Sequence, residues 1–116
     1  MKTISAVLEP IYRKYAVALH ARHIQLDLNI QNPQYEVEHP QKLSKLIAEY
    51  IDSILDKRHH LGDKITIASM TNSNNKYILI RDETQLLSPE GVEHFQSDDV
   101  EIRTRVGFGT FLKIKL

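Results

Sequence analysis

The chain contains no cysteine among its 116 residues. This absence excludes disulfide bonds, thiolate metal sites and thiol nucleophiles, and it is typical of proteins in a reducing compartment. Long apolar runs are also missing, because no window approaches the roughly 18 consecutive apolar residues that a membrane-spanning helix needs. Charged residues and Pro10 interrupt the early apolar stretch, so the first residues do not resemble a signal peptide. We therefore expect a cytoplasmic location and no direct contact with a membrane.

Net charge of either sign is lacking as well, because 15 Lys and Arg residues balance 15 Asp and Glu residues. A neutral chain has no long-range field that would draw it to nucleic acid or to an anionic membrane. We therefore expect no nucleic-acid partner, and any charged contact must come from a local patch. The length and the 41% content of hydrophobic residues predict a single domain, residues 1–116.

Two segments have the apolar periodicity of amphipathic helices. The first covers residues 3–21, and Pro10 inside it predicts either a kink or a true start near Glu9. The second covers residues 40–58, where apolar side chains follow helical spacing without interruption and Pro40 fits the first turn. We expect this second segment to be the central buried helix.

Alternating apolar and polar residues predict strands at residues 24–30, 64–71, 76–81, 100–106 and 108–116. The middle two and the last two are each expected to pair as an antiparallel hairpin. Between the hairpins, Ser88 and Pro89 provide the cap and the first residue of a short helix that runs to Phe95. This order predicts an α/β two-layer sandwich: a mixed, mainly antiparallel sheet of about five strands, with two long helices and one short helix on one face.

Each of the last two predicted strands carries cations on one face. Arg103 and Arg105 follow Glu101 along the first strand, and Lys113 and Lys115 share a face of the second. If these strands pair, the four cations could lie side by side. They would then have one of two roles. Either they lie on the solvent-exposed face of the sheet, where their charge keeps the edge strand from pairing with another chain, or they form a docking site for an acidic protein.

Histidine offers one further candidate for chemistry. His20 and His23 lie three residues apart near a helix end, where they could bind a metal or carry a phosphoryl group. No acidic partner or second pair accompanies them, and His59 and His60 lie in a helix-terminal loop where cations are favoured. We therefore expect no metal site.

Several stretches of the chain resemble, in order and spacing, the ATP-binding domain of sensor histidine kinases and its relatives in gyrase, Hsp90 and MutL. They are residues 24–30 for the first strand, 46–55 for the helix that bears the N box, 78–82 with 88–95 for the G1 region, and 107–116 for the Gly-rich turn and last strand. The resemblance covers nearly the whole chain and implies the same α/β sandwich.

The N box of this family supplies an acid or amide four residues before an asparagine, whose carbonyl oxygen completes the shell of a Mg²⁺ ion. The matching positions here are Glu49 and Ser53. The resemblance implies that Glu49 orients a water molecule, but a serine hydroxyl is a shorter and weaker ligand for Mg²⁺. Asp52 would replace it only if the helix were rotated. The structural alternative for Glu49 is a solvated position on the rim of the helix.

The G1 region of the family contains an aspartate that accepts a hydrogen bond from the adenine amino group, and the resemblance gives this role to Asp82. Its alternative role is to cap the turn that follows the strand. Family members have glycines after this aspartate, so that the backbone passes close to the base. Here residues 83–87 carry side chains that would occupy that space.

A mobile lid, a second Gly-rich box and another helix separate the short helix from the final hairpin in the family, and backbone N–H groups there hold the phosphates. Only residues 96–99 lie between Phe95 and the next strand here, so we predict that the lid is deleted. In a competing alignment, Gly107 and Gly109 form the second Gly-rich box after a shortened lid. The strict alternation of residues up to Leu116 favours a strand instead.

We therefore expect a non-catalytic signalling domain of a bacterial two-component phosphorelay, with no catalytic residue and no cofactor. It would be similar to the kinase-derived α/β domain of Rcs-type phosphorelay proteins. Its vestigial nucleotide-binding residues would be Glu49, Asp52, Ser53, Asp82, Gly107 and Gly109.

The resemblance implies a protein partner, either the receiver domain of a response regulator or the rest of a sensor kinase. The expected contact residues are Arg103, Arg105, Lys113 and Lys115. The domain would be cytoplasmic even as part of a membrane-anchored sensor protein. The alternative functions are a minimal ATP-binding histidine kinase or ATPase domain, which would use Glu49, Asp82 and the Gly107 turn, or a structural module for dimerisation or spacing.

Overall fold

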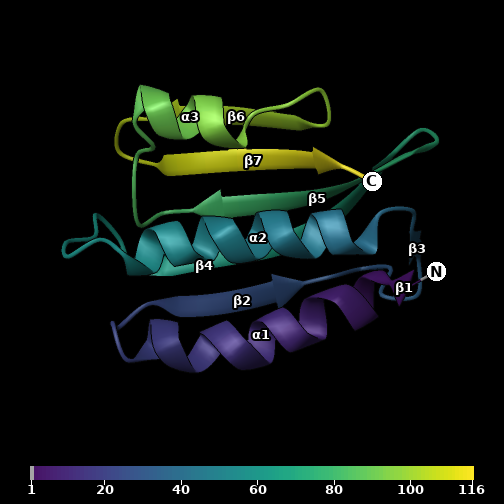
Figure 1. Cartoon of the computed structure of the whole chain (residues 1–116), viewed down its shortest axis with the longest axis horizontal. Coiled ribbons are helices and arrows are strands. Elements are labelled where there is room, and N and C mark those ends of the chain that lie inside the picture. The colour runs from purple at the N-terminus through teal and green to yellow at the C-terminus, as the bar shows by residue number, and fades with distance from the viewer. Residues whose placement is uncertain (1) are drawn as a thin grey trace.

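The computed structural model describes residues 2–116, which form a five-stranded sheet, a two-stranded sheet and three helices (Figure 1). In chain order the elements are β1 (Lys2–Thr3), α1 (Ile4–His20), β2 (Gln25–Asn29), β3 (Glu36–Val37), α2 (Pro40–Leu55), β4 (Lys64–Asn72), β5 (Asn75–Asp82), α3 (Pro89–Phe95), β6 (Val100–Arg105) and β7 (Gly109–Lys115). Every predicted helix and strand is present, so the predicted element order is confirmed.

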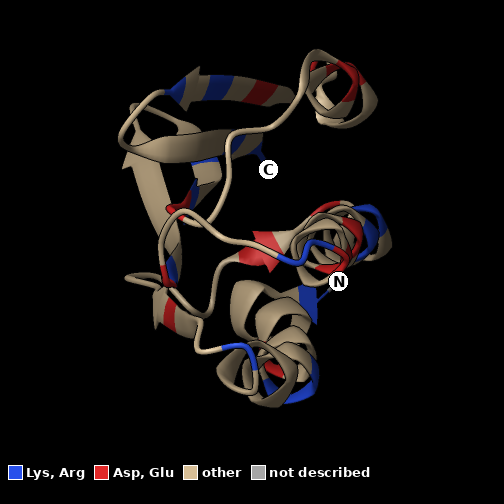
Figure 2. Ribbon diagram, turned by 90° about the vertical axis from the view of Figure 1, so that its left-hand side faces the viewer, with Lys and Arg blue, Asp and Glu red and all other residues tan. Residues whose placement is uncertain are grey.

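The five-stranded sheet has the order β2-β4-β5-β7-β6. β2 runs parallel to β4, and the other neighbouring pairs are antiparallel. The three helices of the described residues all lie on one side of this sheet (Figure 2). The predicted α/β sandwich, with a mixed and mainly antiparallel sheet, is therefore confirmed.

The small sheet joins β1 to β3, where Lys2 pairs with Val37 and Thr3 with Glu36. β1 comes directly before α1 in the chain, and the small sheet lies beside the start of α2 (Figure 1). Sequence periodicity does not predict this sheet, because a strand of two residues contains no alternation to detect.

Helix α1 begins at Ile4, where the side chain of Thr3 accepts a hydrogen bond from the Ala6 N–H at 3.1 Å. The predicted alternative start near Glu9 is therefore wrong. Pro10 lies inside the helix, where it removes one backbone donor. The helix is present on both sides of it because the capped first turns already bury apolar residues against the core.

Helix α2 begins at Pro40 and ends at Leu55, slightly before the predicted end. Proline fits the first position because an N–H there would have no acceptor within the helix. Its inner face carries four side chains with 0% exposure: Ile47, Tyr50, Ile51 and Ile54. It lies beside α1 and over the middle of the sheet (Figures 1 and 2). It is the central buried helix that the periodicity predicts.

Both predicted hairpins are present, as β4 with β5 and as β6 with β7. Along the central strands, residues such as Ile80 and Leu112 point toward the helices and are buried. The residues between them, such as Leu79 and Lys113, point to the opposite side. The sheet thus has an inner face, which the helices cover, and an open face. Within residues 2–116, no helix combines the length and apolarity needed to cross a membrane.

Candidate functional site

Asp82 ends β5 on the inner side of the sheet and has 0% exposure. Its Oδ2 accepts a hydrogen bond from the Tyr50 hydroxyl of α2 at 2.6 Å. Its Oδ1 accepts one from the Thr84 N–H at 2.8 Å and another from the Thr84 hydroxyl at 2.5 Å. Both carboxylate oxygens are therefore bonded to groups of the protein itself.

Tyr50 brings its hydroxyl to Asp82 from the inner face of α2. Burial, together with the negative charge of Asp82, raises the pKa of Tyr50 well above its ordinary value, so the hydroxyl remains a neutral donor. The same hydroxyl accepts a hydrogen bond from Gln85 Nε2 at 3.3 Å. The ring packs edge-on against Phe95 of α3, with 5.3 Å between the ring centres.

Thr110 of β7 anchors the loop that follows Asp82. Its hydroxyl donates to the Gln85 carbonyl at 2.8 Å and accepts from the Leu87 N–H at 3.1 Å. The loop of residues 83–87 is therefore fixed to β7 by two hydrogen bonds. We call the five residues Tyr50, Asp82, Thr84, Gln85 and Thr110 the Asp82 cluster.

The resemblance assigns Glu49, Asp52 and Ser53 of α2 to the nucleotide site, and the first two make no polar contact with the Asp82 cluster among residues 2–116. The Glu49 carboxylate lies 3.9 Å from Lys45 Nζ and 3.8 Å from His94 Nε2, so it faces α3. Asp52 lies on the α1 side of α2, where burial and this carboxylate raise the pKa of Tyr15. The polar contacts of residues 2–116 join neither side chain to Asp82.

Ser53, the third of these residues, bonds within its own helix. Its hydroxyl donates to the Tyr50 carbonyl at 2.5 Å. The hydroxyl that the resemblance matches to a Mg²⁺ ligand is thus bonded to the backbone of α2.

The two glycines before β7 differ in what surrounds them. Gly109 has a φ of 107°, and a Cβ there would lie 2.1 Å from the Asp82 carbonyl oxygen. Gly107 has a φ of 86°, and a Cβ there would meet no atom within 4 Å. Gly109 is therefore needed for the close approach of β7 to the end of β5, whereas Gly107 serves the turn.

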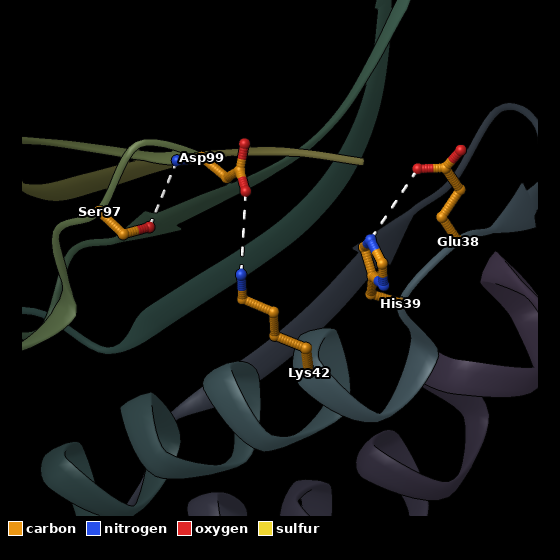
Figure 3. A network of polar contacts seen from close by, with 5 residues as sticks. All are labelled: Glu38, His39, Lys42, Ser97 and Asp99. Atoms are coloured by element: carbon orange, nitrogen blue, oxygen red, sulfur yellow. Dashed lines mark hydrogen bonds and ion pairs between the residues drawn. The ribbon is translucent and has the colours of Figure 1, made fainter.

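A small apolar cavity lies at the other end of α2, between that helix and the ends of β6 and β7. Val37, Leu43, Leu46, Val100, Ile114 and Leu116 provide its apolar lining. At its mouth, Lys42 Nζ lies 3.8 Å from Asp99 Oδ2, and the Asp99 N–H donates to Ser97 Oγ at 3.3 Å (Figure 3). Both partners of the ion pair are exposed, so it contributes little stability.

The predicted partner residues lie on the open face of the last two strands. Glu101 pairs with Lys113, and Arg103 pairs with Phe111. Lys115 lies beyond the start of β6, opposite Asp99. The four predicted cations are therefore staggered along the hairpin, with an acid opposite one of them, and are not arranged as facing pairs.

Each of three cations on this face has a weak partner nearby. Arg103 forms an ion pair with Glu101 at 2.9 Å. The Arg105 guanidinium carbon lies 4.6 Å from the centre of the Phe108 ring, and Lys113 Nζ lies 4.5 Å from that of Tyr77. The contacts of Arg103 and Arg105 are exposed, whereas Lys113 and Tyr77 are half-buried.

Sequence reasoning misses two groups of residues. One is the set of donors and acceptors around Asp82, whose only signal is polar side chains at inward positions: Tyr50 on an apolar helix face and Thr110 in an alternating strand. The other is Arg81, which lies on the open face of β5 opposite Phe111. The only sign of it in the sequence is the alternation of β5, which assigns Arg81 to the face opposite Ile80.

Metal-ligating side chains do not gather in the described part of the chain. Among residues 2–116, no group of three His, Cys, Asp or Glu side chains could hold a metal ion. His20 and His23 are exposed at the end of α1 and the turn after it.

Comparisons with known proteins bear on the fold. No protein-family model matches the sequence, and no curated protein matches it. The catalytic domain of the histidine kinase ThkA superposes with a TM-score of 0.74 at 10% identity, over 99% of this chain and 93% of that chain. This chain has the histidine kinase ATPase fold.

Two further kinases have the same fold. The Acinetobacter baumannii histidine kinase AdeS gives a TM-score of 0.70 at 15% identity over 97% of this chain, and the kinase domain of the E. coli osmosensor EnvZ gives 0.69 at 15% identity over 99%. This chain spans 64% of the AdeS chain and 86% of the EnvZ chain. The fold that the resemblance implies is therefore confirmed.

Proposed function

We propose that this chain is a non-catalytic signalling domain derived from a histidine kinase ATPase domain, and that it acts through protein contacts in a two-component system. The observation that carries the proposal is the bonding of Asp82. Both oxygens of this buried carboxylate accept hydrogen bonds from Tyr50 and Thr84. The position that would hold adenine is closed by the protein's own side chains.

ATP is the ligand that the fold implies, and the residues present do not fit it. An adenine amino group could reach Asp82 only if the Tyr50 hydroxyl moved away, which would leave a buried donor unpaired at a cost of about 1–3 kcal/mol. Ser53 stands where a Mg²⁺ ligand is needed, and its hydroxyl is bonded to a backbone carbonyl. Asp98 and Asp99 stand where the lid would be and would repel a triphosphate.

The partner we propose is the receiver domain of a response regulator or the rest of a sensor kinase. A receiver domain presents an acidic phosphorylation pocket, and the open face offers cations to meet it. The contact residues would be Arg103, Arg105, Lys113 and Lys115. Charge complementarity of this kind sets specificity and association rate more than affinity.

Thermal denaturation with and without Mg-ATP tests the loss of nucleotide binding. We expect an unchanged Tm at millimolar nucleotide, with inorganic triphosphate as the control for ionic strength. A ligand present at 100 times its Kd would stabilise the fold by about 2.7 kcal/mol. A rise of several degrees with Mg-ATP alone would contradict the proposal and favour a minimal ATP-binding domain.

Titration of labelled protein with receiver domains, at low and raised salt, tests the partner. Reversing the charges of Arg103, Arg105, Lys113 and Lys115 together is expected to abolish the salt-sensitive complex. The matched control reverses four cations that are exposed elsewhere on the described surface: Lys14, Lys45, Lys57 and Arg58. A complex that survives the first set of changes would exclude the cationic contact.

A further inference from the structure

The open face of the sheet bears a broad hollow along β5, β7 and β6. Building on the proposed function, from which we take only the role of a protein-interaction domain, we infer that this hollow binds an acidic amphipathic helix of a partner protein. Its apolar floor, its cationic rim and its open shape each favour such an occupant.

Apolar side chains form the floor of the hollow. Leu79 of β5 and Phe111 of β7 are half-buried, and Met70 extends the floor onto β4. No helix of the described residues covers this side of the sheet (Figure 2). Apolar residues on three neighbouring strands favour burial under another element of structure.

Two arginines flank the aromatic ring of the floor. Phe111 pairs with Arg81 on β5 and with Arg103 on β6, so the three residues lie in one row across the sheet. Neighbouring strands lie about 4.8 Å apart, which separates the two arginine backbones by about 10 Å. Aromatic residues and arginines dominate the binding energy of protein interfaces, so this row is the expected centre of the contact.

Exposed apolar side chains gather at one end of the same hollow. Leu61 is 72% exposed, Val106 85% and Phe108 65%. They come from the loop before β4 and from the turn between β6 and β7. A single exposed apolar residue is ordinary, but a group of them beside an apolar floor is typical of an interaction site.

Cations outnumber acids around the hollow. The charged lining consists of Arg81, Arg103, Arg105 and Lys113 with Glu83 and Glu101. Four cations against two carboxylates leave an excess of two positive charges, although the chain as a whole is neutral. This local excess favours a partner with carboxylates on either side of its apolar stripe.

The open shape of the hollow favours a helix over a small molecule. The hollow has a volume of about 1180 Å³ and is open to solvent, whereas small-molecule pockets of about 300–1,000 Å³ bury most of their ligand. The Cβ atoms of residues i and i+4 of a helix lie about 6 Å apart, so two acids at these positions share one face. Arg103 and Arg105, two residues apart on one strand, have a backbone spacing of about 7 Å, which is a close match.

Single-stranded nucleic acid is the competing polyanion, because it stacks on exposed aromatic rings. Here Lys113 already lies over Tyr77, and Arg105 over Phe108. Glu83 and Glu101 in the lining would also repel phosphates. A helix can place its carboxylates away from these two acids, so the observations favour a protein partner.

A peptide titration against the complete chain tests the assignment. The probe is a synthetic peptide of about 18 residues with leucines at helical spacing and glutamates on both flanks. A permuted peptide of equal composition, without the periodicity, is the control. We expect the first peptide to shift the amide NMR signals of Leu79 and Phe111 with a Kd near or below about 100 μM, and the permuted peptide to bind at least about tenfold more weakly.

Variants of the row provide the second arm. Arg81→Glu combined with Arg103→Glu is expected to raise the Kd of the acidic peptide about tenfold or more, and Phe111→Ser is expected to raise it about thirtyfold. Lys14→Glu combined with Arg58→Glu is the matched control and is expected to change the Kd by less than about twofold. Circular dichroism checks the fold, and the charge-reversal pair keeps the test valid should Phe111→Ser not fold.

Four outcomes would overturn the assignment: no peptide binding at millimolar concentration, equal binding of both peptides, an unchanged Kd after charge reversal, or tighter binding of oligouridylate than of the acidic peptide. None of these measurements involves ATP or ADP. Binding of Mg-ATP would contradict the proposed function alone, and the four outcomes above would contradict the docking hollow alone.

Discussion

The two faces of the sheet carry polar groups of opposite kinds. On the inner side, the Asp82 carboxylate is fully buried and has three hydrogen bonds from the protein. On the open face, cations such as Arg103 and Arg105 are exposed and have only weak partners. A buried charge must be satisfied inside the molecule, whereas an exposed charge remains available. The inner cluster is therefore expected to serve stability, and the open face to serve recognition.

The largest expected effect is that of Asp82→Ala. The substitution leaves the Tyr50 hydroxyl and the Thr84 N–H buried without an acceptor. We therefore expect the free energy of unfolding to fall by about 4 kcal/mol. Urea denaturation measures it. Asp99→Ala, which removes an exposed partner of Lys42, is the control and should cost less than about 0.5 kcal/mol. Equal effects of both changes would contradict the stabilising role of the buried Asp82 carboxylate.

Gly109→Ala is next in size. Its Cβ would meet the Asp82 carbonyl oxygen at 2.1 Å, and its φ of 107° disfavours any side chain. We expect a loss of about 3 kcal/mol in the free energy of unfolding. Gly107→Ala, in open space of the same turn, should cost only about 1 kcal/mol. A larger loss at Gly107 than at Gly109 would contradict the close approach of β7 to Asp82.

Tyr50→Phe is expected to cost about 1.5 kcal/mol at neutral pH, because it removes one donor to Asp82. It should also change the response to alkali. Burial and the Asp82 charge raise the pKa of Tyr50 above its ordinary value of 10.0. Folded Tyr50 therefore keeps its proton above pH 10 while the unfolded chain loses it, and stability falls by up to about 1.4 kcal/mol per pH unit.

The Tyr50→Phe variant lacks this contribution, so its stability should fall less steeply than that of the unmodified chain above pH 10. Urea titrations at a series of alkaline pH values measure the two slopes. Tyr12→Phe, at an exposed position of α1, is the control and should keep the original slope. Identical slopes for all three proteins would mean that the Tyr50 hydroxyl is not buried against Asp82.

The smallest effect on stability is expected on the open face. Arg81→Glu combined with Arg103→Glu should change the free energy of unfolding by less than about 0.5 kcal/mol, because both side chains are exposed. Differential scanning calorimetry checks this expectation. A loss of several kcal/mol would show that these cations hold the sheet together and would remove the contrast with Asp82.

Much of the fold can be predicted from the sequence because it is local. Helical spacing marks α1 and α2, strict alternation marks the two hairpins, and Ser88 with Pro89 marks the start of α3. The start of α1 cannot be placed from Pro10 alone, because burial of the first turns outweighs the missing donor. The strands β1 and β3 are too short to leave a pattern.

The candidate site is less predictable because its contacts are long-range. Tyr50 and Asp82 lie 32 residues apart, and only the packing of α2 over the end of β5 brings them together. The stagger of the cations depends on the register of β6 with β7, which fixes Glu101 opposite Lys113. Alternation assigns a face to each residue but does not set this register.

The most direct test of the account follows the Asp82 cluster itself during titration with Mg-ADP. Amide NMR reports the Thr84 and Leu87 N–H groups, and a slowly exchanging hydroxyl proton reports Tyr50. We predict that all three signals stay unchanged at millimolar nucleotide, because Asp82 remains bonded within the protein. Saturable shifts of the Thr84 amide, with loss of the Tyr50 hydroxyl signal, would mean that the base displaces Tyr50 and that the site still binds nucleotide.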